Sequence, residues 1–244
     1  MASNERNQTL YMKILSVDSS ALVASAALCE DGKLLAEFTL NNKNTHSETL
    51  LPMIESLLSF FSLGVEDIDL FALSAGPGSF TGVRIGASTI KGLAFASNKA
   101  CVGVSTLEAI AYNLRYHKGL ICPVMNARRS QVYTALFRSD GENLERLLDD
   151  TAISISELDE ILSAYGEEVA LAGDGYDICV EGFSKTDLRF VPERLRHQSA
   201  FSVAEVAYKN YLNGVQCNDT ELGVNYLRLS QAERERAERE AASC

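Results

Sequence analysis

The residues most suggestive of chemistry form the stretch AGPGSFTGVRIG, from Ala75 to Gly86. A glycine-rich turn before a helix can hold a phosphate on free backbone N–H groups. The spacing departs from the known phosphate templates, because Gly76, Gly78 and Gly82 are one residue too far apart for the dinucleotide fingerprint and no Gly-Lys-Ser/Thr follows. Ser79 also lacks the flanking glycines of a nucleophile elbow.

Two interpretations of this stretch remain open. In the first, ATP or ADP binds weakly, since Gly76 and Gly78 permit close backbone approach to a ligand. Ser79 or Thr81 would cap the following helix, whose first N–H groups attract anions, and Arg84 lies one turn further on. In the second, the stretch is a tight strand-to-helix turn whose small residues serve packing.

A second place for chemistry is the end of the first expected strand, where Asp18 is followed by two serines. Two-lobed ATP-dependent phosphotransferases place acidic residues at such strand ends to hold the magnesium of ATP. The matching position of the second half is Asn126, which cannot act as a charged metal ligand or a base. Asp18 is therefore kept only as a weak nucleotide-binding candidate, in a site with reduced catalytic equipment.

No metal centre or peptidase is indicated. His46, His117 and His197 are isolated in the sequence, and HExxH is absent. The six cysteines form no CxxC pair, which favours buried, reduced thiols in a cytosolic protein.

Composition also limits the partners. The net charge of −11 makes the chain a poor candidate for binding nucleic acid alone, although it could belong to a complex whose partner supplies the positive charge. No apolar run approaches the roughly 18 residues of a membrane span, so we expect no membrane contact.

The hydrophobic pattern repeats one plan twice. The first half predicts strands and helices, in chain order, at 13–18, 21–29, 33–40, 47–62 (helix), 69–75 and 81–98 (helix). The second half repeats the strand trio, helix and strand at 120–125, 131–138, 143–148, 156–165 (helix) and 168–172. We predict a duplicated α/β fold with domains at 12–110 and 111–225 and a tail helix at 226–244.

Several ordered blocks resemble one family. They are KILSVDSS, HSETLLPMIESLL, SAGPGSFTGVRIGASTIKGLA, NARRSQVYTALF, AGDG and NYLRLSQAERER, spread over residues 12–236. The chain is similar to the bacterial TsaB (YeaZ) family of tRNA threonylcarbamoyladenosine biosynthesis proteins, and the glycine stretch is the most specific block.

The resemblance implies a fold, a function and partners. The fold is the duplicated actin-like ATPase fold (ribonuclease H-like, ASKHA), with a mixed sheet and helices in each domain. The function is that of a non-catalytic scaffold that pairs with TsaD, is joined by TsaE, and meets tRNA only through the complex. A homodimer in isolation, a cytoplasmic location and no required cofactor are also implied, and the older label of glycoprotease is not supported.

The chain departs from the family pattern at one place, and it lacks the metal-binding pair of TsaD-like proteins. The family usually carries aspartate at the position of Asn126, which weakens a metal role in the second half. TsaD-like proteins hold a metal with an H-x-x-x-H pair on a helix, whereas here His46 is followed at the fourth position by Leu50.

Such families pair through two helices, and this predicts a partner surface. The expected contact residues are small or apolar: Leu50, Met53, Leu57, Phe60, Gly82, Gly86 and Ile90. The alternative is that Met53 and Phe60 lie under loops of the same chain. A stand-alone nucleotide-binding ATPase or phosphotransferase remains the rival function. A peptidase is the least favoured of the three hypotheses.

Overall fold

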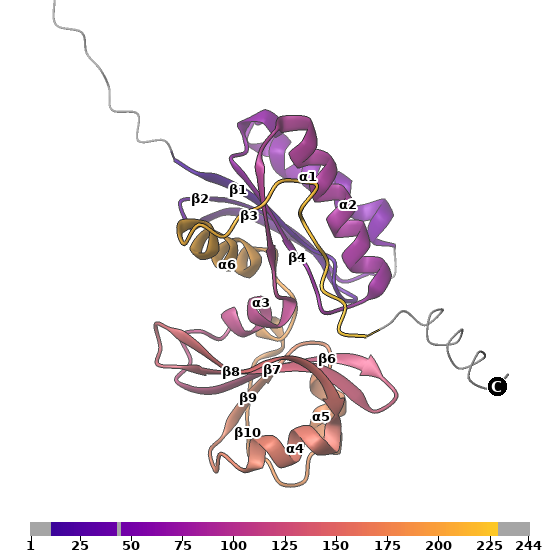
Figure 1. Ribbon diagram of the computed structural model, residues 1–244, viewed down its shortest axis with the longest axis vertical. Helices are drawn as coiled ribbons and strands as arrows, with labels where there is room; N and C mark the ends of the chain where they lie inside the picture. The colour runs from indigo at the N-terminus through magenta and orange to yellow at the C-terminus, as the bar shows by residue number, and fades with distance from the viewer. Residues whose placement is uncertain (1–10, 43–44, 229–244) are drawn as a thin grey trace, which may run out of the picture.

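The computed structural model describes residues 11–42 and 45–228. The first lobe contains a sheet of order β3-β2-β1-β4-β5, the upper sheet in Figure 1. Its strands are β1 (Lys13–Asp18), β2 (Ala24–Glu30), β3 (Lys33–Leu40), β4 (Leu70–Ser74) and β5 (Ala100–Val104). Its helices are α1 (His46–Phe60), the 3-10 turn η1 (Val65–Asp67), α2 (Phe80–Ser97) and α6 (Ala200–Leu212).

The second lobe repeats this arrangement with the sheet order β10-β9-β6-β7-β8. Its strands are β6 (Gly119–Arg128), β7 (Gln131–Ser139), β8 (Leu144–Ser154), β9 (Val169–Ala172) and β10 (Leu188–Arg189). Its helices are α3 (Thr106–Tyr112), α4 (Ile155–Ser163), α5 (Tyr176–Gly182) and the 3-10 turn η2 (Glu193–Leu195). In both lobes the first three strands are antiparallel and the last two run parallel to the first. The predicted duplicated α/β fold is confirmed.

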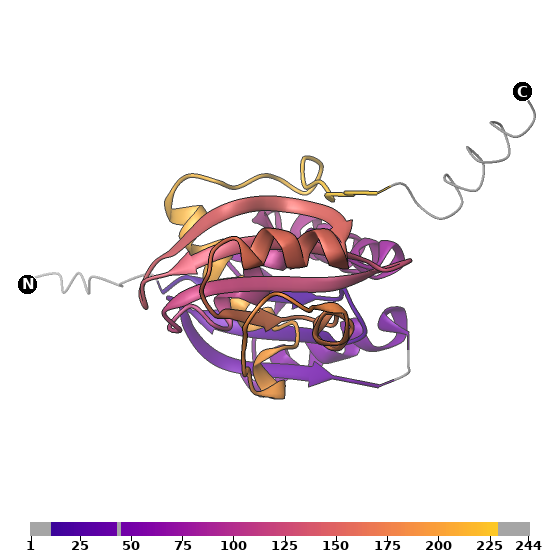
Figure 2. The ribbon, with the colours of Figure 1, turned by 90° about the horizontal axis from the view of Figure 1, so that it is seen from below.

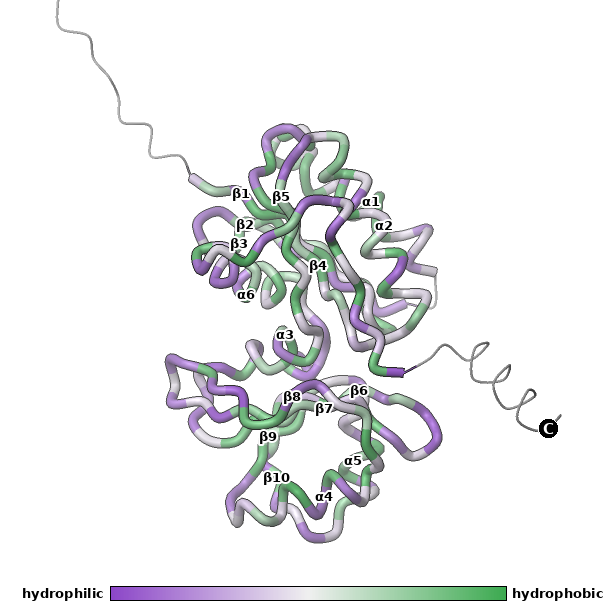
Figure 3. The backbone as a smooth tube through the Cα atoms, in the orientation of Figure 1, coloured by the Kyte–Doolittle hydropathy of each residue, from purple (hydrophilic) through white to green (hydrophobic). Residues whose placement is uncertain are grey.

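Each sheet is covered by helices on both faces, because both faces of its central strands are apolar (Figure 3). Along β1, Leu15 and Val17 face α1 and α2, while Ile14 faces α6. In the second lobe α3 covers one face of the sheet, and α4 and α5 cover the other. The helices α3 and α6 also pack on each other between the two sheets (Figure 1).

The predicted domain limits are wrong at two points. Helix α3, assigned to the first domain up to residue 110, packs against β6 and β7 through Leu107 and Ile110. Helix α6, assigned to the second domain, packs on the first sheet through Val203 and Val206. Each helix therefore buries its apolar face against the sheet of the other predicted domain. Local periodicity shows that a helix has an apolar face, but it does not show which sheet that face covers.

After α6 the chain returns along the first lobe and reaches the second (yellow in Figures 1 and 2). This return segment, residues 213–228, pairs with β5 through a bridge between Cys101 and Cys217. The described part of the predicted tail helix, residues 226–228, is not helical, and the remainder lies outside the described residues. Within residues 11–42 and 45–228, no helix is long and apolar enough to cross a membrane.

Candidate functional site

Asp18, at the end of β1, is closed off from ligands. Its side chain is only 1 % exposed and accepts hydrogen bonds from the Ser20 backbone N–H (2.9 Å), the Ser20 hydroxyl (2.7 Å) and the Ser74 hydroxyl. Burial raises the pKa of Asp18, and these hydrogen bonds offset part of that rise. The assignment of Asp18 to nucleotide binding is therefore wrong, because both carboxylate oxygens hold the local turn together.

The glycine stretch explains why the turn is closed. A Cβ at Gly78 would lie 2.5 Å from the Ser20 carbonyl oxygen, and one at Gly82 would overlap the carbonyl oxygen of Ser19. The Ser79 N–H donates to the Ser20 carbonyl (2.6 Å), and the Ser19 hydroxyl donates to the Gly82 carbonyl (2.9 Å). The start of α2 thus packs directly on the turn after β1, and the strand-to-helix packing interpretation accounts for these glycines.

Gly76 is also buried, with a φ of +106° that glycine adopts readily. A Cβ there would overlap the carbonyl oxygen of Asn225, whose N–H donates to the Ala75 carbonyl (2.7 Å). Gly76 is therefore a contact point for the return segment rather than for a nucleotide, and its assignment to nucleotide binding is wrong.

The remaining nucleotide candidates border open space. A cleft of about 830 Å³ lies between the lobes, and Gly78, Ser79 and Thr81 line it. Arg84 lines a second hollow of about 520 Å³ between α1 and α2, which shares Phe80 and Thr81 with the cleft. The hydroxyl of Ser79 accepts the Gly82 N–H (3.3 Å), as expected of the cap of α2.

The opposite wall of the cleft comes from the second lobe. Asn126 uses its side-chain oxygen to accept the Arg128 N–H (2.8 Å), and its own N–H donates to the Asp174 carboxylate (3.2 Å). Asp174 is exposed at the surface of the cleft, yet desolvation by the surrounding walls raises its pKa. The Asn126 hydrogen bond offsets part of this rise, and the charge of Asp18 adds to it. The residues from Arg128 to Ser130 all have positive φ and form the tip of the β6–β7 hairpin.

The histidines do not assemble a metal site. His46 forms a 2.7 Å hydrogen bond through Nε2 with the Ala21 carbonyl, and it lies at the start of α1. Among the residues that the structure describes, no three His, Cys, Asp or Glu side chains are grouped to hold a metal ion.

The predicted partner surface is largely wrong. Four of its side chains belong to the core between the first sheet and its helices: Leu50, Met53, Leu57 and Ile90. Gly82 and Gly86 pack against Ser19 instead of facing outward. Phe60 alone among these residues is exposed, at 75 %, with its ring edge on Phe38 of β3.

The structure exposes other apolar residues on the same two helices. Leu51 is 45 % exposed beside the hollow between α1 and α2, and Phe95 is 75 % exposed on α2. Gly92, one turn before Phe95, is exposed, and a Cβ there would meet nothing within 4 Å. The signal for these residues was present in the sequence, because Leu51 and Phe95 interrupt the polar faces of helices whose apolar faces are otherwise complete.

The lobes, the sheet orders and the cleft define a duplicated α/β protein with one five-stranded mixed sheet in each lobe. A sequence profile of the family described as "TsaD: tRNA N6-adenosine threonylcarbamoyltransferase" matches residues 33–225. The chain belongs to this family, and within it to the TsaB (YeaZ) group of tRNA threonylcarbamoyladenosine biosynthesis proteins.

Three similar proteins support this placement. The Bacillus subtilis (strain 168) tRNA threonylcarbamoyladenosine biosynthesis protein TsaB is 35 % identical over 66 % of this chain and 71 % of its own length. The protein of the same name from Escherichia coli (strain K12) is 35 % identical over 56 % of this chain and 62 % of its own length. The solved structure of YeaZ from Pseudomonas aeruginosa has a TM-score of 0.74 at 25 % identity, covering 88 % of this chain and all of that one.

Proposed function

We propose that this chain is a non-catalytic subunit in the biosynthesis of threonylcarbamoyladenosine in tRNA, and that it binds a TsaD-type threonylcarbamoyltransferase through α1 and α2. The names of its relatives support the pathway. The proposed binding of this partner rests on the exposed apolar surface of these two helices. We call this surface the α1–α2 face and define it by Leu51, Phe60, Gly92 and Phe95.

Gly92 adds a specific argument for a helix as partner. A glycine inside a helix costs about 1 kcal/mol relative to alanine, and packing within this chain does not require one at Gly92, where a Cβ has open space. A small residue on an outer helix face lets a second helix approach closely. The exposed rings of Phe60 at the end of α1 and Phe95 on α2 would supply apolar area for such a contact.

The closed turn after β1 supports a non-catalytic role. The carboxylate of Asp18 is occupied by serine hydrogen bonds, and the glycine stretch fills the place next to it. Asn126 at the matching place of the second lobe brings no charge. These features disfavour the rival stand-alone ATPase.

The remaining parts of the proposal follow from the same face and cleft. ATP or ADP would bind weakly at the lining formed by Gly78, Ser79 and Thr81. A homodimer would use the α1–α2 face and compete with the TsaD-type partner, TsaE would join the assembled pair, and the complex would work in the cytoplasm.

Size-exclusion chromatography with light scattering tests the proposal on a mixture of this chain and the threonylcarbamoyltransferase of the same cell. We expect a one-to-one complex with the wild type, none with Leu51→Asp/Phe95→Asp, and an unchanged complex with the control Phe190→Asp. Phe190 is 76 % exposed on the second lobe and matches Phe95 in type and exposure. Absence of a wild-type complex under every nucleotide condition would overturn the proposal.

A further inference from the structure

Three arginines in or beside the cleft have no carboxylate partner among the described residues. Among the described residues, the lysines and arginines paired with carboxylates are Lys13, Lys99, Arg115, Arg138, Arg146, Lys185 and Arg189. Arg84, Arg128 and Arg228 make no such pair with any described residue, although the chain carries a net charge of −11. Within the described part of the chain, no carboxylate neutralises their positive charge, which an anion can therefore meet.

The arginines are held in place by neutral groups. The Arg84 Nε–H donates to the Tyr226 hydroxyl (2.8 Å), and its guanidinium lies 3.7 Å from the centre of the Phe80 ring. An Arg228 N–H donates to the Ala127 carbonyl (2.9 Å), next to Arg128. Neutral partners fix the positions of two guanidinium groups without neutralising them.

The three side chains border connected hollows. Arg128 and Arg228 line the cleft, and Arg84 lies at its boundary. Arg84 lines the hollow that also holds Leu51 of the α1–α2 face, and it reaches the cleft through its hydrogen bond to Tyr226. Among the described lining residues the only carboxylate is that of Asp174. The arginines come from α2, the end of β6 and the return segment, so the positive charge follows a path across both lobes.

An aromatic ring lies on the same path. Tyr226 is 42 % exposed, and its ring packs against Phe80 at a tilt of 37°, with the centres 4.8 Å apart. The contacts to Phe80 and Arg84 hold the ring while leaving part of it open to solvent. Exposed rings beside arginines are the usual platform for an unstacked base, and the arginines accept the neighbouring phosphates.

We propose that Arg84, Arg128 and Arg228 bind successive phosphates of an RNA strand, with Tyr226 as the stacking platform for one of its bases. This inference rests on the proposed function and deepens it, because it gives the non-catalytic subunit a direct contact with the RNA substrate. The acidic remainder of the chain repels nucleic acid, so the contact operates only when the partner supplies the main affinity. An RNA strand fits arginines that come from α2, the end of β6 and the return segment better than a free nucleotide, whose phosphates need converging donors.

The test measures binding of a fluorescein-labelled anticodon stem-loop RNA to the complex of this chain with its threonylcarbamoyltransferase, over a series of salt concentrations. The test variant is Arg84→Ala/Arg128→Ala/Arg228→Ala. The control is Lys33→Ala/Arg194→Ala/Lys209→Ala, which removes the same charge from three exposed positions that form no ion pair with described residues. Light scattering on each sample confirms that the complex is intact.

We expect the test variant to bind the RNA about tenfold more weakly and to lower the salt slope by about two, since each lost single-strand contact removes about 0.7. The control should stay within about twofold of wild type. The single variant Arg128→Glu should also weaken RNA binding. It should fold normally, because no described residue accepts a hydrogen bond from the Arg128 side chain.

Equal losses in test and control variants would overturn the inference while leaving the proposed function intact. Weakened binding of ATP or ADP with unchanged RNA binding would also overturn it, in favour of a free nucleotide. Failure of the wild-type complex to form is a separate result, read by light scattering, and it contradicts the proposed function itself.

Discussion

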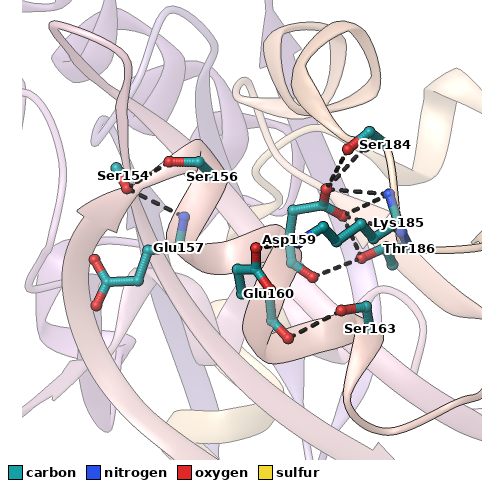
Figure 4. Close-up of polar contacts among 9 residues, drawn as sticks. All are labelled: Ser154, Ser156, Glu157, Asp159, Glu160, Ser163, Ser184, Lys185 and Thr186. Atoms are coloured by element: carbon teal, nitrogen blue, oxygen red, sulfur yellow. Dashed lines mark hydrogen bonds and ion pairs between the residues drawn. The ribbon is translucent and has the colours of Figure 1, made fainter.

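Asp159 shows how one carboxylate can fix a loop. It lies 4 % exposed on α4 and accepts hydrogen bonds from the backbone and hydroxyl of Ser184, the backbone of Lys185, and the backbone and hydroxyl of Thr186 (Figure 4). Burial raises the pKa of Asp159, but the Ser184, Thr186 and Lys185 hydrogen bonds outweigh it, so the pKa is lowered. The ionised carboxylate therefore stabilises the folded state.

We expect Asp159→Asn to lower the free energy of unfolding by about 2 kcal/mol at pH 7, because the amide nitrogen cannot accept these hydrogen bonds. A lowered folded pKa means that the contribution is present above the ordinary value of 3.8 and is lost as pH falls through the folded value. Urea denaturation at pH 7 and pH 3 checks this, and the gap between wild type and variant should narrow in acid. A gap independent of pH would contradict the role of the charge.

The roles of single residues could be predicted from the sequence only where they depend on residue type and not on distant contacts. The absence of a charged metal ligand or base at Asn126 follows from residue type alone. The burial of Asp18 does not, because it depends on Ser74, which is 56 residues away. Arg228 and Tyr226 were missed for the same reason, since their contacts with Ala127 and Arg84 span 101 and 142 residues.

Among the elements, α2 carries two glycines with opposite roles. Gly82 packs on Ser19, where a Cβ would overlap a backbone oxygen, whereas Gly92 faces open space. We expect Gly92→Ala to raise the free energy of unfolding of the isolated chain by about 0.5–1 kcal/mol, and Gly82→Ala to lower it by about 2 kcal/mol or more. Thermal and urea unfolding of the two variants measure this contrast.

Gly92 also links the element to the proposed partner. A leucine at Gly92 should leave the chain folded and abolish the complex with the threonylcarbamoyltransferase, because a bulky side chain would separate the two helices. Light scattering on the mixture checks this. An intact complex with Gly92→Leu would place the partner elsewhere on the chain.

The elements themselves were largely predictable. The strands Lys13–Asp18 and Lys33–Leu40 have the predicted bounds, because alternating or continuous apolar runs and turn residues define them locally. The different environments of Met53 and Phe60 on α1 were not predictable in the same way. Met53 and Phe60 are seven residues apart on one side of the helix, yet Met53 covers the sheet and Phe60 lies at the helix end beside Phe38 of the edge strand β3.

The whole molecule depends on the joint between α3 and α6, where the lobes meet. Arg115, just after α3, pairs with Glu205 of α6 at 2.5 Å, and both side chains are mostly buried. Burial raises the pKa of Glu205, while the Arg115 charge and hydrogen bond lower it in part. One carboxylate oxygen of Glu205 has no hydrogen-bond partner among the described residues, so the arginine is the main compensation for the buried charge.

Removing the arginine should weaken this joint. We expect Arg115→Ala to lower the free energy of unfolding by about 3 kcal/mol at pH 7, because it leaves a buried charge unpaired. The pKa of Glu205 would then rise further, and a raised folded pKa means stability that is present below the ordinary value of 4.5 and lost as pH rises. The defect should therefore shrink near pH 4.5, and Arg115→Ala/Glu205→Gln should recover part of the loss at pH 7. Urea denaturation across this pH range tests both effects, and a defect that persists unchanged in acid and in the double variant would show that Arg115 acts through packing rather than charge.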